Sequence, residues 1–339
     1  MITFVGDIFT SEIDVPSVDF QGTVVYNQEF VIGDVNVLHP AENTVNLINN
    51  TSIAKRMFGK AEKLYANLSN NHIFDYGLDG LESTKCTLQK ENIGIFGDVL
   101  ENQTKTVCQI DGRNVVFLGY YMNAFTSEDE IKGMTNILEK DLAEGKENNN
   151  IVFVIFHFGN EHYPRASEEQ MKIAHKVIDL GAEMVIGHHS HCIQNIEKYK
   201  GKYIFYSLGD FYFPNFVSKA FWNNGMSKSD FMWRNLSWTK KGLAVSYNLS
   251  TNDVEVYKTC FTKKKIKYKK INMNRLKANR INQNMNKLIG EMRKLVLFIL
   301  WNLCINGQLI YWEGILCKFQ SVKQNGRFKK VDGVKNDKK

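Results

Sequence analysis

The sequence has few cysteines, no pair of them in a CxxC arrangement, and no apolar run long enough to cross a bilayer. Its six cysteines are scattered between residues 86 and 317, which argues against a disulfide framework and against a zinc site built from thiolates. We therefore expect a reducing compartment. The 339 residues, 43% hydrophobic and 12% aromatic, exclude collagen-like, low-complexity and wholly disordered chains and suffice for a large core.

The main candidate for a membrane segment is Leu295–Ile305, an eleven-residue stretch interrupted by Asn302. A transmembrane helix needs ~20 apolar residues, so this segment is better interpreted as a buried or interfacial helix. The first residues, Met1–Val5, have neither the basic start nor the long apolar stretch of a secretory signal. These absences predict a cytoplasmic or membrane-peripheral protein.

Charge divides the chain into two unlike parts. Residues 1–213 carry a net charge of −12 and residues 214–339 carry +19. The basic part includes the run Lys263–Lys270 and an Asn- and Lys-rich segment with helical spacing at 273–292. We predict a domain at 1–262 and a basic, largely helical extension at 263–339, which either lies on an anionic membrane surface or is a solvated appendage. Without a nucleic-acid-binding motif, basic charge predicts no specific nucleic-acid partner.

Strand-like and helix-like segments alternate over the first two thirds of the chain, which indicates an α/β fold class. Ile151–Phe156 is a continuous apolar run typical of a strand buried on both faces. Ser167 begins a helix that Gly181 ends. The other expected strands are Ile2–Val5, Thr23–Tyr26, Lys63–Leu68, Val107–Ile110, Val115–Tyr120, Glu183–Ile186, Lys202–Tyr206, Gly242–Leu249 and Asp253–Phe261, and the other expected helices are Leu78–Asn92 and Glu128–Glu144.

Six of the eight histidines follow three of these strands, in the stretches Asn71-His72, His157 with His162, and His188–His191. Asp7 and Glu29 follow two further strands. Sites in open α/β sheets form at the carboxyl ends of strands, so we expect these side chains to meet at one rim. Imidazole, carboxylate and amide groups together suit Mn, Fe or Zn. One or two such ions would lower the pKa of a bound water and neutralise charge on an ester or phosphoryl oxygen.

A set of short motifs carries a family resemblance over roughly residues 1–215. They are VGDI (5–8), Asn-x-Glu (27–29), SNNHIFDYGLDGLEST (69–84), HFGNEHY (157–163), GHHSH (187–191) and YSLGDF (206–211). With these motifs the chain resembles the CapA family of capsule synthesis, whose domain is similar to calcineurin-type metallophosphoesterases. The resemblance implies a four-layer α/β sandwich, a metal-binding rim, and a capsule or envelope polymer, or its precursor, as partner.

Carried over by position, the resemblance implies a metal site made of Asp7, Glu29, Asn71, His72, His157, His189 and His191. It also implies that His188 and His72 are the catalytic candidates. Arg165 and Glu161 are candidates for substrate binding, although an exposed arginine and a solvated loop are the alternatives. Asp75 is expected to cap the helix that begins near Leu78, and Cys192 to be a buried thiol rather than a ligand.

Four positions depart from the family pattern. The superfamily begins its site with Asp-x-His, whereas Phe9 stands at the histidine position here. Gln28 replaces a usual Leu, Ser190 a usual Pro, and Asp210 a usual Asn. The missing histidine puts a full two-metal centre in doubt, and Asp210 either compensates for it or is a turn residue.

Two functions follow as hypotheses. The first is a metal-dependent hydrolase, of phosphoesterase type, that acts in capsule or exopolymer biosynthesis on a polysaccharide, a poly-γ-glutamate or a precursor. The second is a non-catalytic assembly component that binds a polyanionic envelope polymer. The retained Asn-His and His-x-His stretches favour the first, and the absent histidine favours the second.

Overall fold

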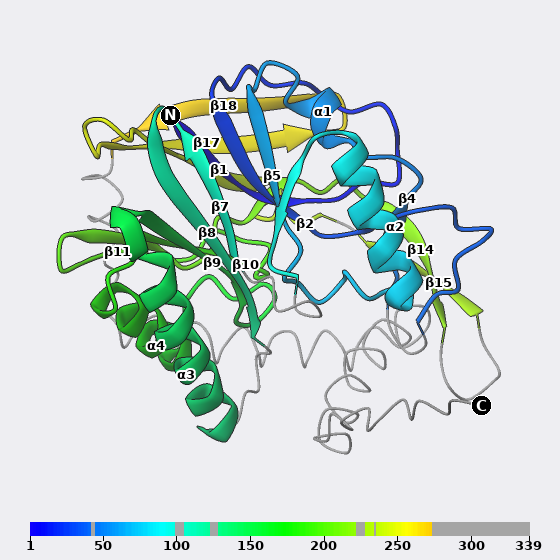
Figure 1. The fold of residues 1–339 in the computed structure, drawn as a ribbon. Coiled ribbons are helices and arrows are strands. Elements are labelled where there is room, and N and C mark those ends of the chain that lie inside the picture. The colour runs from blue at the N-terminus through cyan, green and yellow to red at the C-terminus, as the bar shows by residue number, and fades with distance from the viewer. Residues whose placement is uncertain (42–44, 99–104, 123–127, 222–227, 234, 273–339) are drawn as a thin grey trace. The chain divides into compact units, whose positions relative to one another are not determined.

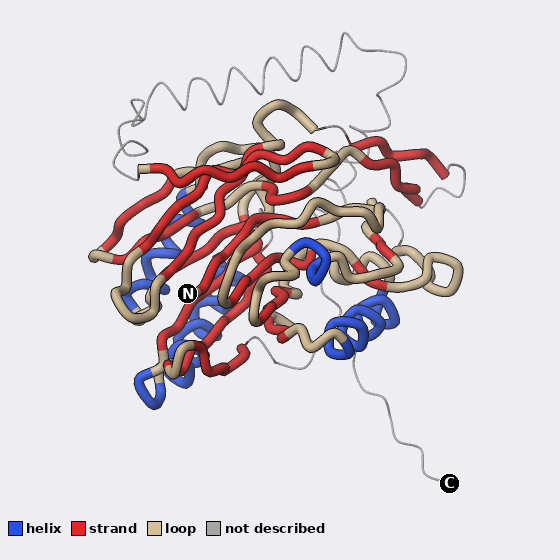
Figure 2. Tube along the Cα trace, turned by 90° about the horizontal axis from the view of Figure 1, so that it is seen from above, coloured by secondary structure: helices blue, strands red, loops and turns tan. Residues whose placement is uncertain are grey.

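Two β-sheets form the centre of the chain, and helices lie outside them (Figures 1 and 2). The computed structural model describes residues 1–41, 45–98, 105–122, 128–221, 228–233 and 235–272. Most of these residues belong to one unit, which consists of 1–41, 46–218 and 232–279. A second unit consists of 42–45, 219–231 and 280–339, and few of its residues are described. The expected segments 273–292 and 295–305 lie outside the described residues.

The first sheet has eight strands in the order β18-β17-β16-β1-β2-β5-β6, with β13 paired to β1. Strands β1, β2, β5 and β6 run parallel, and β16, β17 and β18 are antiparallel to their neighbours. The bounds are β1 Ile2–Ile8, β2 Thr23–Gln28, β5 Lys63–Asn67, β6 Gly94–Phe96, β13 Asp210–Tyr212, β16 Lys241–Tyr247, β17 Val254–Thr262 and β18 Lys265–Ile271.

The second sheet has six strands in the order β11-β12-β10-β9-β8-β7. Its four middle strands are parallel, and β7 and β11 are antiparallel edges. The bounds are β7 Lys105–Ile110, β8 Arg113–Met122, β9 Ile151–Phe158, β10 Met184–His188, β11 Ile196–Tyr199 and β12 Lys202–Phe205. Two short pairs complete the described strands, β3 (Val31–Ile32) with β4 (Ile48–Asn49) and β14 (Phe216–Phe221) with β15 (Lys228–Trp233).

Apolar side chains fill the space between the two sheets. Phe4 of β1 lies with its ring centroid 6.1 Å from that of Phe117 on β8 and 5.1 Å from that of Phe153 on β9. This inner core accounts for the continuous apolar sequence of β9, whose other face packs against helices. Burial of this kind is the main stabilising contribution to a fold of this size.

Helices cover the outer faces and make four layers in all. They are α1 Ala54–Met57, α2 Gly77–Lys90, α3 Glu128–Gly145 and α4 Glu168–Asp179, together with a 3₁₀ turn at Glu147–Asn149. Leu138 and Leu142 of α3 and Val177 of α4 pack against the second sheet. Next to α1, Phe58 packs on Tyr26 of the first sheet, and α2 packs on β3 and β6. The predicted α/β fold class and four-layer sandwich are confirmed.

The beginning of α4 is specified locally. Ser167 accepts a hydrogen bond from the backbone N–H of Gln170, and the Gln170 side chain accepts one from the backbone N–H of Ser167. This reciprocal capping box satisfies two backbone donors that a helix start otherwise leaves unpaired. The predicted start of this helix is confirmed.

The expectation of a helical extension from residue 263 is wrong for its first residues, because β18 adds a strand to the first sheet at Lys265–Ile271. Ile266 is buried while the lysines on both sides of it are exposed. Backbone pairing with β17 and this single buried side chain decide the structure of a segment that looks like a charge run. Lysines on an edge strand also oppose edge-to-edge association.

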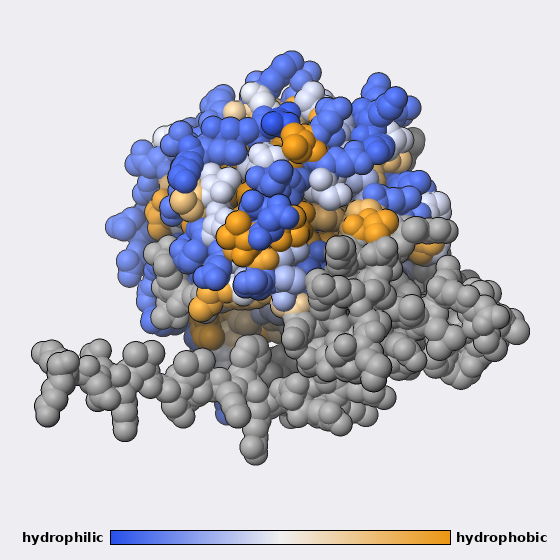
Figure 3. Space-filling model, turned by 90° about the vertical axis from the view of Figure 1, so that its right-hand side faces the viewer, coloured by the Kyte–Doolittle hydropathy of each residue, from blue (hydrophilic) through white to orange (hydrophobic). Residues whose placement is uncertain are grey.

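Some large hydrophobic side chains of the described residues are exposed. Val35, Val37 and Leu78 are among them, and Figure 3 shows small hydrophobic patches among hydrophilic residues on one side of the molecule. Scattered exposure of this kind is normal for a folded chain. None of the helices that the structure describes is long and apolar enough to cross a bilayer.

Candidate metal centre

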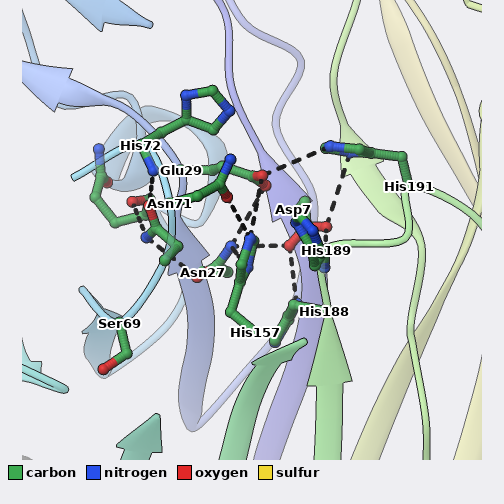
Figure 4. A network of polar contacts seen from close by, with 12 residues as sticks. Asp7, Asn27, Glu29, Ser69, Asn71, His72, His157, His188, His189 and His191 are labelled. Atoms are coloured by element: carbon green, nitrogen blue, oxygen red, sulfur yellow. Dashed lines mark hydrogen bonds and ion pairs between the residues drawn. The ribbon is translucent and has the colours of Figure 1, made fainter. Parts of the chain in front are cut away.

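Four parallel strands deliver buried polar side chains to one rim. Asp7 lies near the end of β1, Glu29 follows β2, and His157 and His188 lie at the ends of β9 and β10. All four are at most 2% exposed. Figure 4 shows these residues pointing toward one another. The predicted convergence is therefore present in the structure.

The geometry of β1 brings a second strand to the same point. β1 pairs with β16 as far as Val5 and with β13 from Asp7 on, so that Asp7 lies beside Asp210, and the register with β13 shifts between Asp7 and Ile8. Gly6 permits this approach, because a Cβ at that position would lie 1.8 Å from the carbonyl oxygen of Gly209. A side chain larger than hydrogen is excluded here by backbone contact.

One group of ligand-type atoms consists of Glu29, His157 and His189, which lie within 4.8 Å of one another. Oε1 of Glu29 lies 3.7 Å from Nε2 of His157. The rings of His157 and His189 have centroids 4.6 Å apart. Asn71 adds an amide oxygen, because its Oδ1 lies 2.7 Å from Nε2 of His157.

A second group consists of Asp7, His191 and Asp210. Nδ1 of His191 lies 2.8 Å from Oδ1 of Asp210 and 3.9 Å from Oδ2 of Asp7. On its other side, Nε2 of His191 lies 3.6 Å from Oε1 of Glu29. His191 therefore stands between the two groups.

Asn27 connects both groups and received no role from the sequence. Its Nδ2 lies 2.9 Å from Oδ1 of Asp7, 3.4 Å from Oε2 of Glu29 and 3.2 Å from Nδ1 of His157. Asn67 in turn donates to Oδ1 of Asn27 at 3.1 Å. Positions 27 and 29 are two apart at a strand end, where alternate residues share a face, and this spacing is the signal that would have identified Asn27.

The loop after β10 holds its histidines in unusual backbone conformations. His189 and His191 have φ angles of +87° and +51°, which non-glycine residues adopt at an energetic cost. The backbone N–H of His189 donates to Oδ2 of Asp7 at 3.1 Å. His188 lies with Nδ1 2.9 Å from Oδ1 of Asp7. In the same loop Cys192 is buried, with Sγ 3.7 Å from Oγ of Ser190.

His72 lies at the border of the centre, with its ring apart from the ligand groups in Figure 4. Its Nδ1 lies 2.7 Å from Oδ2 of Asp75. The expectation that Asp75 caps α2 is wrong. Tyr76 is the N-cap without a side-chain hydrogen bond, and Asp75 instead accepts from the backbone N–H of Leu47. Because its carboxylate contacts His72 and the backbone of Leu47, Asp75 orients the imidazole of His72 and does not cap the helix.

Phe9 fills its position with an aromatic packing contact. Its ring centroid lies 4.7 Å from that of Phe216, 5.3 Å from Phe213 and 5.7 Å from Phe30. Phe213 also contacts His191, at 4.9 Å between ring centroids. Where the superfamily pattern has an imidazole, this chain has the apolar ring of Phe9, which packs beside the second group.

The loop after β9 lies next to the centre. Burial lowers the pKa of His162, whose ring lies 5.4 Å from that of Trp233. Glu161 is half-buried, and its charge adds to the effect of burial in raising the pKa of Tyr121. The backbone carbonyl of Arg165 accepts from Nε2 of Gln194 at 3.0 Å. Substrate binding by Glu161 and Arg165 stays a prediction.

The buried ionisable groups strongly shift one another's pKa values. Burial and the charge of Asp7 raise the pKa of Glu29. Burial raises the pKa of Asp210 to about 7. Burial alone would also raise the pKa of Asp7, but His188 beside it holds that pKa well below the usual range. Burial lowers the pKa of His157, whereas Asp210 and Glu29 outweigh burial and raise the pKa of His191.

These residues fit a divalent cation. Oε1 of Glu29 and Oδ2 of Asp210 are buried and accept no hydrogen bond from the described residues. Burial of three carboxylates in their charged form is costly without a cation, and burial accordingly raises the pKa values of Glu29 and Asp210. Carboxylate with imidazole is the donor set of Zn, Mn or Fe sites. The individual ligand roles inferred from the sequence stay predictions.

Known proteins that are similar to this chain include proteins of capsule synthesis. A family model described as "Bacterial capsule synthesis protein PGA_cap" matches residues 16–215. The PGA biosynthesis protein CapA of Bacillus subtilis is 27% identical over 222 residues, covering 62% of this chain and 56% of that protein. The capsule biosynthesis protein CapA of Bacillus anthracis is 30% identical over 161 residues, covering 43% of this chain and 39% of that protein.

The chain thus spans about half the length of these relatives or less. Among solved structures, a phosphatase from Mycoplasma pneumoniae is 11% identical with a TM-score of 0.39, over 80% of this chain and 92% of that one. The family match covers more than half of the chain and includes the strand ends that carry Glu29, His157 and His191. The chain belongs to the bacterial capsule synthesis protein family, in agreement with the resemblance found in its motifs.

Proposed function

We propose that this protein is a metal-dependent hydrolase that acts on a phosphoryl, ester or amide-type bond of a capsule polymer or of its precursor. The observation that carries the proposal is the pair of buried groups, Glu29 with His157 and His189, and Asp7 with His191 and Asp210. A fold does not maintain several buried ionisable groups at one rim for stability alone, because each costs desolvation. The names of the relatives favour a capsule-type polymer as the material on which the centre acts.

Each group in the centre has a role that follows from its position. Glu29, His157 and His189 would hold one cation, and Asp7, His191 and Asp210 would hold a second. A bound cation of this kind activates a water and offsets charge on the attacked group. Asn27 holds the side chains of Asp7, Glu29 and His157 at fixed distances, which preserves the geometry when the ligands would otherwise repel.

His72 is suited to move a proton at the border of the centre. The Asp75 carboxylate next to its Nδ1 favours the tautomer that carries a hydrogen there. Nε2 is then the atom that exchanges a proton with a leaving group, as in other carboxylate–imidazole pairs. We therefore assign His72 to proton transfer rather than to metal binding, and His188 to the orientation of Asp7.

A non-catalytic role in polymer assembly is the second candidate, and the observation that favours it is Phe9. The packing of Phe9 against three other phenylalanines leaves the second group with an apolar neighbour on one side. Under this alternative the rim binds a polyanionic envelope polymer and the ion serves only to hold it. The two candidates differ in whether bound metal is accompanied by turnover.

Metal analysis combined with hydrolysis of an aryl phosphate ester tests the proposal. The purified full chain is expected to hold one to two equivalents of Mn, Fe or Zn and to hydrolyse the ester. His157→Ala is expected to lose both properties, since His157 is buried at the centre. His175→Ala is the matched control, because His175 lies on α4 and contacts Glu197 rather than a residue of the metal centre. Protein that binds capsule polymer but does not hydrolyse the ester, with or without bound metal, would establish the assembly role instead.

A further inference from the structure

The end of the first sheet that carries Asp7 also carries an exposed basic and apolar surface that the metal centre does not use. Nine lysines and only two acidic residues occur between residues 240 and 270, and all nine lysines are exposed. We propose that this surface docks the protein onto an anionic lipid membrane. We call it the basic rim and define it by Leu236, Trp238, Lys240, Lys241, Lys264, Lys265 and Lys267.

Strand register places two lysines of the basic rim, Lys241 and Lys267, in one row across the sheet. Lys241 of β16 is opposite Cys260 of β17, which is opposite Lys267 of β18. Residues directly opposite in antiparallel strands share one face. The next row on the same face is Leu243, Lys258 and Lys269, and Leu243 belongs to the inter-sheet core. The face that forms the core at one end of these strands is therefore basic at the other.

This concentration of charge is not compensated within the described part of the chain. Lys263 pairs with Glu12 at 2.7 Å and Lys270 with Glu255 at 2.5 Å, whereas the lysines of the basic rim form no ion pair with a described residue. Lys258 and Lys269 even lie directly opposite each other, which destabilises a strand pair. Protection of an edge strand explains lysines on β18, but not Lys240 and Lys241, which lie at the start of β16.

An exposed apolar pair distinguishes a lipid partner from a soluble polyanion. Leu236 and Trp238 are 44% and 46% exposed. Their turn is attached to the sheet, because Lys241 N donates to the carbonyl of Trp238 and Phe261 N to the carbonyl of Lys240, at 3.2 and 3.1 Å. Tryptophan beside lysines is typical of surfaces that enter the headgroup region of a bilayer. A soluble polyanion would be bound by the charges alone.

The basic rim adjoins the metal centre through the backbone. Gly242, next to Lys241, forms a β-bridge with Gly209, which precedes Asp210. The hydroxyl of Tyr212, in the same strand as Asp210, donates to the carbonyl of Lys263 at 3.0 Å. Docking through this surface would hold the rim of the sheet at the membrane. The inference does not depend on the chemistry proposed for the centre.

Vesicle flotation with the purified full chain tests the inference. The probes are vesicles of phosphatidylcholine alone and vesicles of phosphatidylcholine mixed equally with phosphatidylglycerol. We expect binding to the mixed vesicles only, weakening as salt rises. Lys265→Gln with Lys267→Gln should weaken this binding roughly 25-fold, from about fivefold per lysine near an anionic surface. Trp238→Ser should weaken it about tenfold through lost apolar contact.

Lys140→Gln with Lys172→Gln is the control of equal charge, because both lysines are exposed on α3 and α4, and it should bind as the original protein does. Equal binding to both kinds of vesicle, or equal loss in the control, overturns the inference. Soluble poly-L-glutamate is the competing probe. Binding to it that is lost with the lysines, together with vesicle binding that is indifferent to Trp238→Ser, would identify a polyanion as the partner instead. Leu236→Ser repeats the apolar test, and metal content reports separately on the centre.

Discussion

The imidazole of His191 lies with Nδ1 2.8 Å from Oδ1 of Asp210, a carboxylate delivered by a strand that is distant in sequence. This contact exists because β13 pairs with β1 at the point where β1 leaves β16. The pairing places an aspartate, Asp210, where the family pattern usually has an asparagine. Asp210 lies on the same side of the centre as Phe9, which stands where the superfamily has a histidine. The departure at Asp210 and the departure at Phe9 thus concern the same group of ligand-type atoms.

Asp210→Asn should weaken metal binding at the second group while leaving the first group occupied. The change removes a buried negative charge beside Asp7 and His191, and loss of a carboxylate near a metal typically lowers affinity 10- to 100-fold, as an order-of-magnitude expectation. Titration calorimetry with Mn²⁺ or Zn²⁺ and metal analysis after dialysis measure the effect. Asp179→Asn, at the end of α4, is the control. If the variant still binds a second equivalent of metal as the original protein does, Asp210 is a turn residue.

The metal-free protein should lose stability as pH rises from about 4 to about 7 through the contribution of Asp210. Burial raises the pKa of this carboxyl from 3.8 to about 7, so the folded state retains a proton that the unfolded state has released. Its contribution is therefore complete below pH 4 and lost as pH passes 7. The effect is on the order of a few kcal/mol. Urea unfolding in EDTA at several pH values checks it.

Asp210→Asn should flatten this pH dependence, because it also removes the group that most raises the pKa of His191. Glu29, whose pKa is also raised, likewise contributes stability that is lost as pH rises, and it remains in the variant. His157, whose pKa burial lowers, contributes stability that is lost as pH falls below 6.5, and it is common to both proteins. The comparison of the two proteins therefore reports on Asp210 together with the shift that Asp210 causes in the pKa of His191. Identical slopes would contradict the assigned direction.

His72→Gln should reduce hydrolysis of the aryl ester without removing metal. A proton-transferring group typically contributes 10²- to 10⁴-fold, as a rough range. Asp75→Asn should cause a smaller loss, because the imidazole stays in place but its tautomer is no longer selected. Rates as a function of pH and metal content together test both. If His72→Gln loses metal in proportion to activity, His72 is a ligand as the resemblance implied.

Asn27→Ala should destabilise the protein by about 1–3 kcal/mol and impair both metal positions. The change removes the amide that contacts Asp7, Glu29 and His157, and with it a hydrogen-bond partner of Oε2 of Glu29 and of Nδ1 of His157 in a buried place. Denaturant unfolding with and without metal measures the cost. Asn36→Ala, on an exposed turn, provides the comparison. A variant that retains full stability and metal content would show that Asn27 only fills space.

Gly6→Ala should prevent folding or lower the free energy of unfolding severely. The new Cβ would lie 1.8 Å from the carbonyl oxygen of Gly209, so the pairing of β1 with β13 would have to open. Gly133→Ala in α3 is the contrasting change, since no atom lies within 4 Å of its added Cβ. It should stabilise the protein by up to about 1 kcal/mol. Thermal unfolding of both variants checks the pair, and equal stability would contradict the close approach.

The strand-end positions of Asp7, Glu29, His157 and His188 were predictable because polar residues that directly follow apolar runs meet at one edge of a parallel sheet. The role of Asp75 was not predictable in the same way. An acidic residue shortly before a helix usually caps it, and only the path of the chain brings the backbone of Leu47 and the ring of His72 to this carboxylate.

Residues 265–271 are a second case in which the sequence alone did not predict the structure. A run of lysines has no periodicity that indicates a strand, and its structure comes from pairing with β17 and the burial of Ile266. The same pairing creates the row of Lys241, Cys260 and Lys267, which residues distant in sequence form together. Neither feature is local, so neither is visible in the order of residues.

By itself the sequence determined which chemistry this protein can hold, because residue types and their places after apolar runs depend on local pattern alone. The tertiary structure decided which of these side chains lie close enough to act together. Strand pairing at the end of β1 joins Asp7 to Asp210, and close backbone contact at Gly6 makes that pairing feasible. The physical reason is that register and crossing between distant strands are set by the packing of the whole core rather than by the residues at the rim.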